Sequence, residues 1–582
     1  MATEARESEM DWVVVEHHGR PTSQITMSLR LGAVRAMSRS GVVSPQHTLL
    51  CRPHQPHKLG STKRKILERC FATQVKHSDA GNQSDDQKER VVILGSGWGG
   101  YTMSRRLSPK NFSPIIVSPR SYFVFTPLLT DTASGSLDFS NIVEPVRDPG
   151  AKVDFIQAAA RSVDLKKKTI LCEATVVKSG VTESPRTHED ERETEEGPEA
   201  SDKQPIQPRR LWEKGETFEV PYDKLVIAVG AVSRTFGTPG VRQNAMFFKD
   251  IGDAKRVKRR LRECFELAVL PTTTTDMKKW LLHFAIVGAG PTGTELTASL
   301  RDFIYEDMIA LYPGLQGLPK LSLYDVAPKV LSTFDESLSR YAMKTMKSEG
   351  IDIKTSHHVK GLRWGPPGAP PPYDMDPKHC LTLTTEEEGE VGVGMCVWAT
   401  GNAMTKLVSR SLNEVNDFPE DSVFKMDRSS GATSAEQSWE FKKVPKTGAL
   451  LVDGHLRVQL QNDAGDTATG APPATAQATF QEAKWLASHL NKDDLAHTSP
   501  FSFRNMGTLA YIGSEKALMQ IPHDMHDVNK RKSYLPEGIT GRMARLVWNA
   551  AYITMSISWR NKIRVAFRWT LNRLFGRDVS RF

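Results

Sequence analysis

Short apolar runs alternate with helical patterns through most of the chain after residue 90, and this alternation predicts strands and helices in turn. The apolar run at 91–94 leads into a glycine-rich turn and a helical pattern from Tyr101 to Leu107, and a second apolar run follows at 115–117. Strand, helix and strand in this order form a βαβ unit, which opens a parallel sheet. A second unit of the same kind begins near Leu281. The predicted fold class is therefore α/β.

Each unit carries the motif Gly-x-Gly-x-x-Gly where its first strand turns into its helix. The motif occupies 95–100 in the first unit and 288–293 in the second. The first glycine makes the tight turn, the second lets backbone N–H groups approach a pyrophosphate, and the third allows the helix to pack closely on the strand. One match is weak evidence, but two in this context predict two dinucleotides and two Rossmann-like domains. This is the plan of a flavoprotein that takes hydride from a nicotinamide.

The end of the chain has the pattern of amphipathic helices. Residues 546–559 are apolar and uncharged, but a helix needs about 20 such residues to span a bilayer. In the next segment one helical face carries Ile563, Ala566, Phe567, Thr570, Leu571 and Leu574, and arginines decorate the rest. The arginine and tryptophan residues beside this stripe favour a helix in a membrane interface over one packed on its own domain or on a second subunit.

Low-complexity stretches separate these regions. Residues 182–210 are acidic and proline-rich, which predicts a disordered surface insertion, and 365–379 and 427–445 are predicted to be loops. The predicted boundaries are 1–89 for a leader and linker, 90–245 for the first part of the first dinucleotide-binding domain, 246–405 for the second such domain, 406–498 for a linker and the rest of the first domain, and 499–582 for a C-terminal membrane-anchoring domain.

The leader has the composition of a mitochondrial transit peptide. Between Met27 and Phe71 the chain is rich in Arg, Ser, His and Lys, and Glu68 is the only acid. The sequence around Phe71 resembles a processing site. A basic disordered tail is the alternative, but the sustained depletion of acids favours a transit peptide. We expect either that Met27 is the real start or that residues 1–26 are a gene-model extension.

Composition excludes several other classes of protein. The 582 residues allow two or three domains, and the net charge of +9 comes without any nucleic-acid motif, so an anionic membrane surface fits it and no nucleic-acid partner is predicted. The six cysteines are scattered without a Cys-x-x-Cys pair. This argues against a disulfide scaffold, a zinc site and a dithiol relay, and no metal site is predicted.

Several long runs together resemble the type II NADH:quinone oxidoreductases, or alternative NADH dehydrogenases, of mitochondria. The likeness covers nearly everything from residue 90 onward except the insertions, and it rests on the runs 94–100, 118–129, 288–295, 476–482, 509–513 and 575–582. It implies a single-chain enzyme that does not pump protons and is attached peripherally to one face of the mitochondrial inner membrane. NADH would pass hydride to a non-covalently bound FAD, and ubiquinone would then take two electrons and two protons.

In this family the first βαβ unit binds FAD. The residues that the resemblance and the motif assign to FAD are Gly95, Ser96, Gly97, Trp98, Gly100, Pro127, Gly230 and Asp466. An acid normally ends the second strand of such a unit and binds a ribose, but Ser118 stands there in this chain, as a serine does in the family. Pro127 is expected near the flavin ring, and a purely structural role for its segment is the alternative.

The second unit is predicted to bind NADH. Gly288, Gly290 and Gly293 would face the pyrophosphate, and Asp325 ends the next strand, where its carboxylate accepts both ribose hydroxyls. A negative charge there repels a 2′-phosphate and favours NADH over NADPH. The positive charge of Lys329, four residues further on, argues instead for tolerance of NADPH. The resemblance adds Asn402 as a weaker candidate contact on the nicotinamide side.

The candidate catalytic residues come mainly from the resemblance. Glu295 lies near the start of the helix after the second glycine turn, where a carboxylate can simply complement the helix dipole. The resemblance instead places it beside the nicotinamide and the flavin. Gln477 and Gln481 share one helix face and would border the quinone pocket. Lys516 matches a lysine near the flavin ring that could stabilise anionic reduced flavin.

One segment departs from the family. The family places a strand that ends in Ala-x-Gly-Asp after a Leu-Arg-Val segment, and this Asp binds the FAD ribitol chain. Here Leu-Arg-Val at 456–458 is followed by polar residues, and no apolar strand precedes Asp466. Either Asp466 acts from a loop, or the sequence has lost a piece at a mis-predicted splice junction. We favour the second reading, which would weaken flavin retention.

Two alternative functions follow from these observations. A related FAD-dependent NAD(P)H reductase with a different acceptor would need neither the amphipathic C-terminus nor Gln477 and Gln481. A flavin-deficient, non-catalytic scaffold on the membrane would follow from the missing strand. The sequence leaves open whether the chain forms a homodimer.

Overall fold

The computed structural model describes residues 88–176, 215–368, 380–413, 415, 440–445, 447–461, 475–521, 538–577 and 579. All of them belong to one compact unit, Asn82–Phe582. The predicted transit peptide, the predicted insertion at 182–210 and the flavin candidate Asp466 lie outside the described residues.

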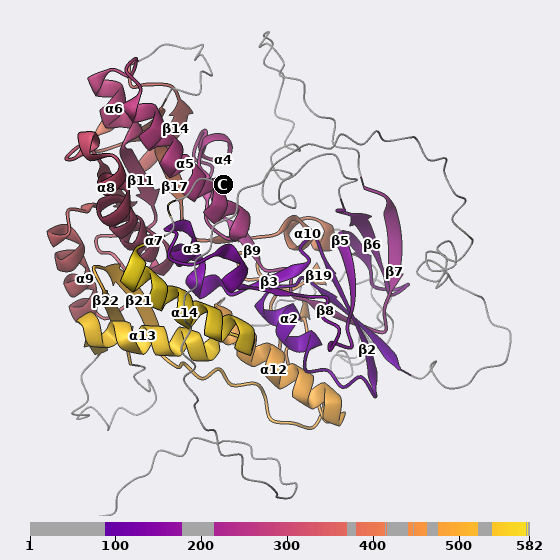
Figure 1. Ribbon diagram of the computed structural model, residues 1–582. Coiled ribbons are helices and arrows are strands. Elements are labelled where there is room, and N and C mark those ends of the chain that lie inside the picture. The colour runs from indigo at the N-terminus through magenta and orange to yellow at the C-terminus, as the bar shows by residue number, and fades with distance from the viewer. Residues whose placement is uncertain are drawn as a thin grey trace, which may run out of the picture. The chain divides into compact units, whose positions relative to one another are not determined.

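The first sheet is mixed, with parallel and antiparallel pairs, and grows from the first βαβ unit (Figure 1). Strand β1 (Glu89–Leu94) lies between β2 (Phe112–Ser118) and β8 (Lys224–Ile227) and is parallel to both. The sheet continues from β2 through β5 (Asp154–Asp164), β6 (Thr169–Ala174) and β7 (Thr217–Pro221). The residues of β1 from Val91 onward are buried, as a strand covered on both faces requires.

Strand β8 is an edge of this sheet in the part of the chain that the structure describes. Each of its four residues is only half-buried, although three are apolar. A central strand of a parallel sheet would be covered on both faces. Partial exposure of this kind is what we expect of a strand at the edge of a sheet.

Two helices cover the first glycine turn. Helix α2 (Trp98–Ser104) starts three residues before the predicted Tyr101, because Gly97 is already its N-cap. Helix α12 (Ala476–Lys492) packs against α2, and its Asn491 side chain accepts a hydrogen bond from the backbone N–H of Ser108 at 2.7 Å. A segment almost 400 residues further along the chain therefore completes the first domain.

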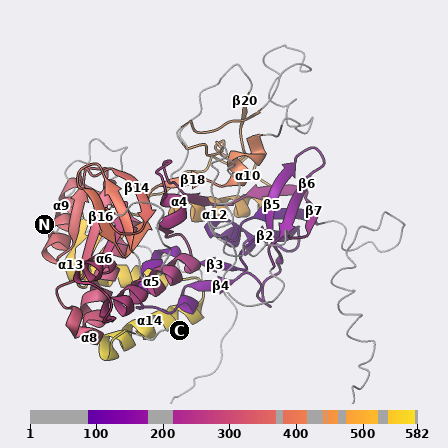
Figure 2. The ribbon, with the colours of Figure 1, turned by 90° about the horizontal axis from the view of Figure 1, so that it is seen from above.

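The second unit forms a sheet of parallel strands. Its order is β10 (Met246–Phe247), β17 (Met395–Trp398), β11 (His283–Val287), β12 (Lys320–Asp325) and β13 (Asp352–Thr355). Its helices include α5 (Ile251–Val269), α6 (Thr275–Leu281), α7 (Pro291–Asp302) and α9 (Glu336–Ser348). An antiparallel sheet of β14 (Val359–Trp364), β15 (Leu381–Thr385) and β16 (Gly389–Val393) lies beside α6 (Figure 2).

Two short strands join the two domains, β9 (Ala231–Ser233) and β18 (Asn402–Met404), which pair antiparallel. The other helices and strands of these domains are short. They are β3 (Tyr122–Val124), η1 (Thr126–Leu128), α3 (Leu129–Ala133), η2 (Phe139–Asn141), β4 (Val143–Pro145), α4 (Val241–Asn244), η4 (Phe303–Met308), α8 (Ile309–Leu311), η5 (Pro313–Leu315), α10 (Lys406–Ser409), η6 (Ser411–Asn413), β19 (Glu440–Phe441) and β20 (Leu460–Gln461). The predicted α/β fold with two Rossmann-like sheets is confirmed.

The C-terminal region consists of a small sheet and two helices, which are yellow in Figure 1. The strands are β21 (Thr508–Gly513), β22 (Lys516–Gln520) and β23 (Gly538–Thr540), and the helices are α13 (Gly541–Met555) and α14 (Trp559–Phe575). The predicted apolar run at 546–559 is thus divided by a break between two helices. Within the described ranges, no helix combines the length and the apolar character that a membrane crossing requires.

Candidate functional site

The first glycine turn has the geometry of a pyrophosphate cradle. Gly95 has a φ of +105°, and a Cβ atom there would lie 2.3 Å from the carbonyl oxygen of Ala228. A Cβ atom at Gly100 would lie 1.9 Å from the carbonyl oxygen of Gly95, so the helix can approach the turn only without a side chain. Gly97 faces open space instead, with no atom within 4 Å of a Cβ position. The turn therefore leaves room for a ligand at its second glycine.

The second glycine turn repeats this geometry. Gly288 has a φ of +108°, and a Cβ atom at Gly293 would lie 1.8 Å from the carbonyl oxygen of Gly288. Gly290 is the N-cap of α7, has no atom within 4 Å of a Cβ position, and leaves the helix without a side-chain cap. Its open N-terminus can bind an anion. Two turns of the same shape therefore open two separate domains.

Serine replaces the usual acid beside the first turn. The buried hydroxyl of Ser96 lies 3.0 Å from the hydroxyl of Ser118, at the end of β2. Trp98 donates its indole N–H to the hydroxyl of Thr126 at 3.0 Å, which places Trp98 beside the segment that contains Pro127. Gly230 lies between β8 and β9 with no atom within 4 Å of a Cβ position. These predicted residues surround the C-terminal ends of β1, β2 and β8.

Asp325 closes the second turn at the end of β12. Its carboxylate accepts hydrogen bonds from the backbone N–H groups of Ala289 and Ala327. The Asp325 carboxylate is therefore held beside the second glycine turn, as the sequence predicts. The ammonium of Lys329 lies 2.8 Å from the carboxylate of Glu336, so its charge is already compensated.

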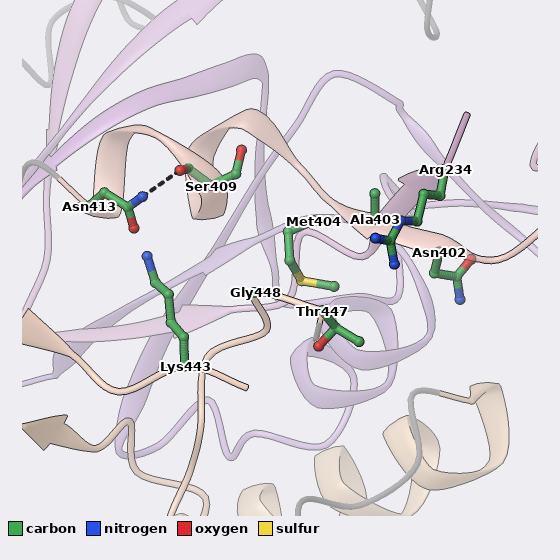
Figure 3. A pocket seen from close by; sticks show the side chains of 9 residues that line it. All are labelled: Arg234, Asn402, Ala403, Met404, Ser409, Asn413, Lys443, Thr447 and Gly448. Carbon is green, nitrogen blue, oxygen red and sulfur yellow. Dashed lines mark hydrogen bonds between the residues drawn. The ribbon is translucent and has the colours of Figure 1, made fainter. Parts of the chain in front are cut away.

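Asn402, the first residue of β18, lines a pocket beside the pairing of β9 with β18 (Figure 3). The cavity is about 390 Å³ and is lined by Arg234, Asn402, Ala403, Met404, Ser409, Asn413, Lys443, Thr447 and Gly448. Figure 3 shows Arg234 and Asn402 at one end and Lys443 at the other, with Met404 between them. The amide oxygen of Asn402 accepts a hydrogen bond from Lys249. Neither glycine turn nor Glu295 lines this pocket.

Glu295 lies on α7, and its side chain is buried. Its carboxylate accepts a hydrogen bond from the backbone N–H of Tyr511 at 3.1 Å. Burial raises the pKa of Glu295 to about 8, and the N–H of Tyr511 opposes this shift. A carboxyl group with this pKa carries a proton at neutral pH and can release it to a neighbouring acceptor.

Gln477 and Gln481 lie on one face of α12, as their spacing predicts, and both bind the segment 504–507. Gln481 accepts a hydrogen bond from the N–H of Arg504 at 3.1 Å and donates one to its carbonyl oxygen at 2.8 Å. Gln477 accepts from the N–H of Met506 at 3.3 Å and donates to the carbonyl oxygen of Gly507 at 3.5 Å. The two amides therefore hold the segment that leads into β21.

Lys516 is held by an acid at the C-terminal end of α9. Its ammonium lies 3.2 Å from the carboxylate of Glu349, and Arg301 lies 2.9 Å from the same carboxylate. Arg301 is six residues beyond Glu295 on α7, which corresponds to about 9 Å along the helix. The ion pair offers no support for the predicted role of Lys516 at a flavin ring.

Two charged residues next to Glu295 were missed in the sequence. Asp131 on α3 is 3% exposed and accepts a hydrogen bond from the indole N–H of Trp569 on α14 at 3.1 Å. The guanidinium of Arg545 on α13 lies 4.2 Å from the ring centres of both Tyr511 and Trp548. The available signal was weak: Asp131 follows the run 118–129, and Arg545 precedes the apolar run 546–559.

The C-terminal helices leave an apolar face uncovered by the described residues. Trp559, Ile563, Phe567 and Leu574 are 77%, 66%, 62% and 69% exposed. The opposite face of α14 is held by polar contacts, for example from the Asn561 amide to the carbonyl oxygen of Val143 at 2.9 Å. The predicted apolar stripe therefore points outward and is not part of the core.

Comparison with known proteins places these features in a family. Residues 89–417 match the family described as pyridine nucleotide-disulphide oxidoreductase, and residues 505–578 match the NDH2 C-terminal domain. A Dictyostelium discoideum protein named "Probable NADH dehydrogenase" is 31% identical, and the alignment covers 85% of this chain and 92% of that protein. The external alternative NADH-ubiquinone oxidoreductase of Yarrowia lipolytica mitochondria is 30% identical, with 86% and 81% covered.

A solved structure supports the fold. NDH2 from Plasmodium falciparum in complex with NADH matches with a TM-score of 0.61 at 21% sequence identity, covering 85% of this chain and all of that one. At this identity the match concerns the fold alone.

Proposed function

Because the chain belongs to the type II, or alternative, NADH:quinone oxidoreductase family, we propose that it oxidises NADH and reduces ubiquinone at the mitochondrial inner membrane, with FAD as its bound cofactor and without pumping protons. The observation that carries this proposal is the pair of glycine turns of equal geometry, with the buried Glu295 on the helix that follows the second turn. Two dinucleotides and one proton-bearing carboxyl group are what a two-step transfer of hydride and electrons requires.

We assign FAD to the first turn. Gly97 leaves open space there, and Gly95 and Gly100 allow the backbone to approach closely, so the residues present fit a pyrophosphate. Trp98 and the segment around Pro127 form the adjacent wall. A bound FAD supplies the redox chemistry, which is hydride acceptance from NADH and electron donation to a quinone. The chain's own residues hold and orient it.

We assign NADH to the second turn. The open N-terminus of α7 at Gly290 would bind the pyrophosphate, and Asp325 would accept hydrogen bonds from the adenosine ribose. The backbone N–H groups of Ala289 and Ala327 hold the Asp325 carboxylate in place, and its charge disfavours a 2′-phosphate. Lys329 does not offset this charge freely, because it is paired with Glu336.

Glu295 and the two glutamines would take part in the binding and reduction of the quinone. Glu295 holds a proton at neutral pH on its buried carboxyl group, and reduction of a quinone to a quinol consumes two protons. Gln477 and Gln481 fix the segment 504–507, which we place at the border of the quinone pocket. Their role in this proposal is to shape that border.

The outward face of α13 and α14 would bind the lipid surface. Its exposed apolar side chains lie among arginines such as Arg560 and Arg564, which suits the headgroup region of an anionic membrane. Arg545 and Trp548 on α13 interact with Glu295. The membrane surface and the proton-bearing carboxyl group would therefore lie on opposite faces of the same helices.

A second candidate function rests on strand β8. Its residues are half-buried at a sheet edge within the described part of the chain, which is expected if the wall that carries the ribitol-binding acid is absent. A chain that retains no flavin would be a membrane-bound scaffold. One experiment separates the candidates: measure the flavin content of the purified full-length protein, and compare quinone reduction by NADH and by NADPH. Stoichiometric FAD with NADH-dependent activity supports the enzyme, and protein without flavin or activity supports the scaffold. Flavin without quinone reduction indicates a different acceptor.

A further inference from the structure

A cluster of buried charges lies where four elements of different regions meet. Helix α7 contributes Glu295, α3 contributes Asp131 and α13 contributes Arg545, while β21 contributes the backbone N–H of Tyr511. Helices α3 and α7 pack on each other, α7 packs on β21, and α13 packs on β21 and β22. Two carboxyl groups and one guanidinium group therefore share one poorly solvated site.

Asp131 is the unexpected member of this cluster. The side chain is 3% exposed, and its carboxylate accepts a hydrogen bond from the indole N–H of Trp569 at 3.1 Å. Burial raises the pKa of Asp131, and the positive charge of Arg545 opposes this shift. A buried carboxylate with a single neutral donor is costly unless a nearby cation compensates it. Arg545 is the nearby cation with the largest effect.

Within the described residues, the ionic contact of Arg545 is a loose one. Its side chain is 11% exposed and lies against the rings of Tyr511 and Trp548, and its contact with the exposed Glu515 is a loose 4.0 Å. Among the described residues, its Nε and Nη1 groups have no hydrogen-bond partner. Asp131 and Glu295 are buried acids whose pKa its positive charge lowers, so they can balance this charge.

The cluster is electrically neutral when one of its two carboxyl groups is ionised and the other is protonated. With Asp131 ionised, Arg545 charged and Glu295 protonated, the charges of Asp131 and Arg545 cancel. If the charge of Asp131 is removed, Arg545 favours the ionised form of Glu295, and if the charge of Arg545 is removed, Asp131 favours the protonated form. The two residues therefore act on Glu295 in opposite directions.

We propose, on the basis of the function proposed above, that Asp131 and Arg545 are positioning residues that set the protonation of Glu295 and thereby the supply of a proton to the quinone. The groups that face Glu295 and Asp131 from the packed elements are Asp131 on α3, Tyr511 on β21, Glu515 in the β21–β22 turn, Arg545, Trp548 and Tyr552 on α13, Trp569 on α14 and Arg577 after it.

The test compares the pH profiles of four variants of the full-length holoenzyme. The measured quantity is kcat for quinone reduction at saturating NADH and quinone, and Glu295→Gln identifies the alkaline limb that belongs to Glu295. Asp131→Asn keeps an acceptor for Trp569 and should move that limb to lower pH by about one unit, whereas Arg545→Gln should move it to higher pH by a similar amount. Asp138→Asn is the matched control, because Asp138 is 54% exposed and pairs with Arg568, and it should leave the limb in place.

Opposite shifts are the result that a merely structural role would not produce. If Glu295→Gln removes the limb but Asp131→Asn and Arg545→Gln leave it unmoved, or move it the same way, the inference is overturned while the proposed function stands. If the wild type reduces no quinone, the proposed function fails. The protonation claim is then decided by infrared titration of the Glu295 carboxylic C=O band, which Asp131→Asn must move to lower pH. The same titration decides the claim if a variant loses its flavin.

Discussion

Replacing Gly290 by alanine should weaken NADH binding while leaving the fold intact. Gly290 has φ −70° and ψ −178°, a conformation open to any residue, and no atom lies within 4 Å of the added Cβ position. Alanine is a poorer N-cap than glycine, so the free energy of unfolding should fall by less than about 1 kcal/mol. The methyl group would occupy the space through which the backbone approaches the pyrophosphate.

The loss of affinity follows from the hydrogen bonds that the methyl group blocks. A hydrogen bond to a charged group is worth about 1.5–3 kcal/mol, so one lost contact should raise the dissociation constant for NADH by about tenfold to a hundredfold. Gly293→Ala is the matched variant in the same turn. Its Cβ atom would lie 1.8 Å from the carbonyl oxygen of Gly288, so the helix must move away from the strand, and overpacking of this kind costs about 1–3 kcal/mol of stability.

The assay combines an equilibrium titration with NADH and a denaturant unfolding curve for each variant. Gly290→Ala should show weak NADH binding with nearly unchanged unfolding, and Gly293→Ala should unfold at lower denaturant concentration. Wild-type affinity for NADH in Gly290→Ala would refute the assignment of this turn to the pyrophosphate. Equal destabilisation of both variants would refute the difference in packing between the second and third glycines.

Three further predictions concern the other residues of the account. Asp325→Asn should lower the ratio of kcat/KM for NADH to that for NADPH, because the charge that repels a 2′-phosphate is gone; an unchanged ratio would contradict this role. Burial raises the pKa of Glu295 from 4.5 to about 8, so the folded protein holds a proton that the unfolded chain releases. The free energy of unfolding should therefore fall as pH rises between these values, and Glu295→Gln should lack this component in denaturation curves across that range. Phe567→Asp and Ile563→Asp should each weaken sedimentation with anionic vesicles by about tenfold or more, since burying such a side chain is worth about 1.5–3 kcal/mol, whereas Leu311→Asp, at a residue 54% exposed on α8, should not.

The sequence was informative wherever one local backbone geometry is required. Both glycine turns, the strands around them and the position of Asp325 could be predicted, because each depends on residues within one βαβ unit. The outward apolar stripe of α14 could be predicted for the same reason, since helical periodicity alone decides which side chains share a face.

Contacts between distant segments could not be predicted. Asp131 and Trp569 are more than 400 residues apart, and nothing in the local pattern of either indicates that they meet. Gln477 and Gln481 were placed on one face correctly, but their binding to the backbone of 504–507 depends on the path of a loop. The place of Lys516 at a flavin ring stays a prediction, and its ion pair with Glu349 depends on the packing of α9 on the C-terminal sheet.

The central claim is that this one chain passes electrons from NADH through a bound flavin to a quinone. Anaerobic mixing of the purified full-length protein with NADH, followed by ubiquinone, tests it most directly, with the visible flavin absorbance as the readout. The account predicts that NADH bleaches a stoichiometric flavin band and that ubiquinone restores it within the turnover time. A protein without a flavin band, or a bleached band that ubiquinone does not restore, would contradict it.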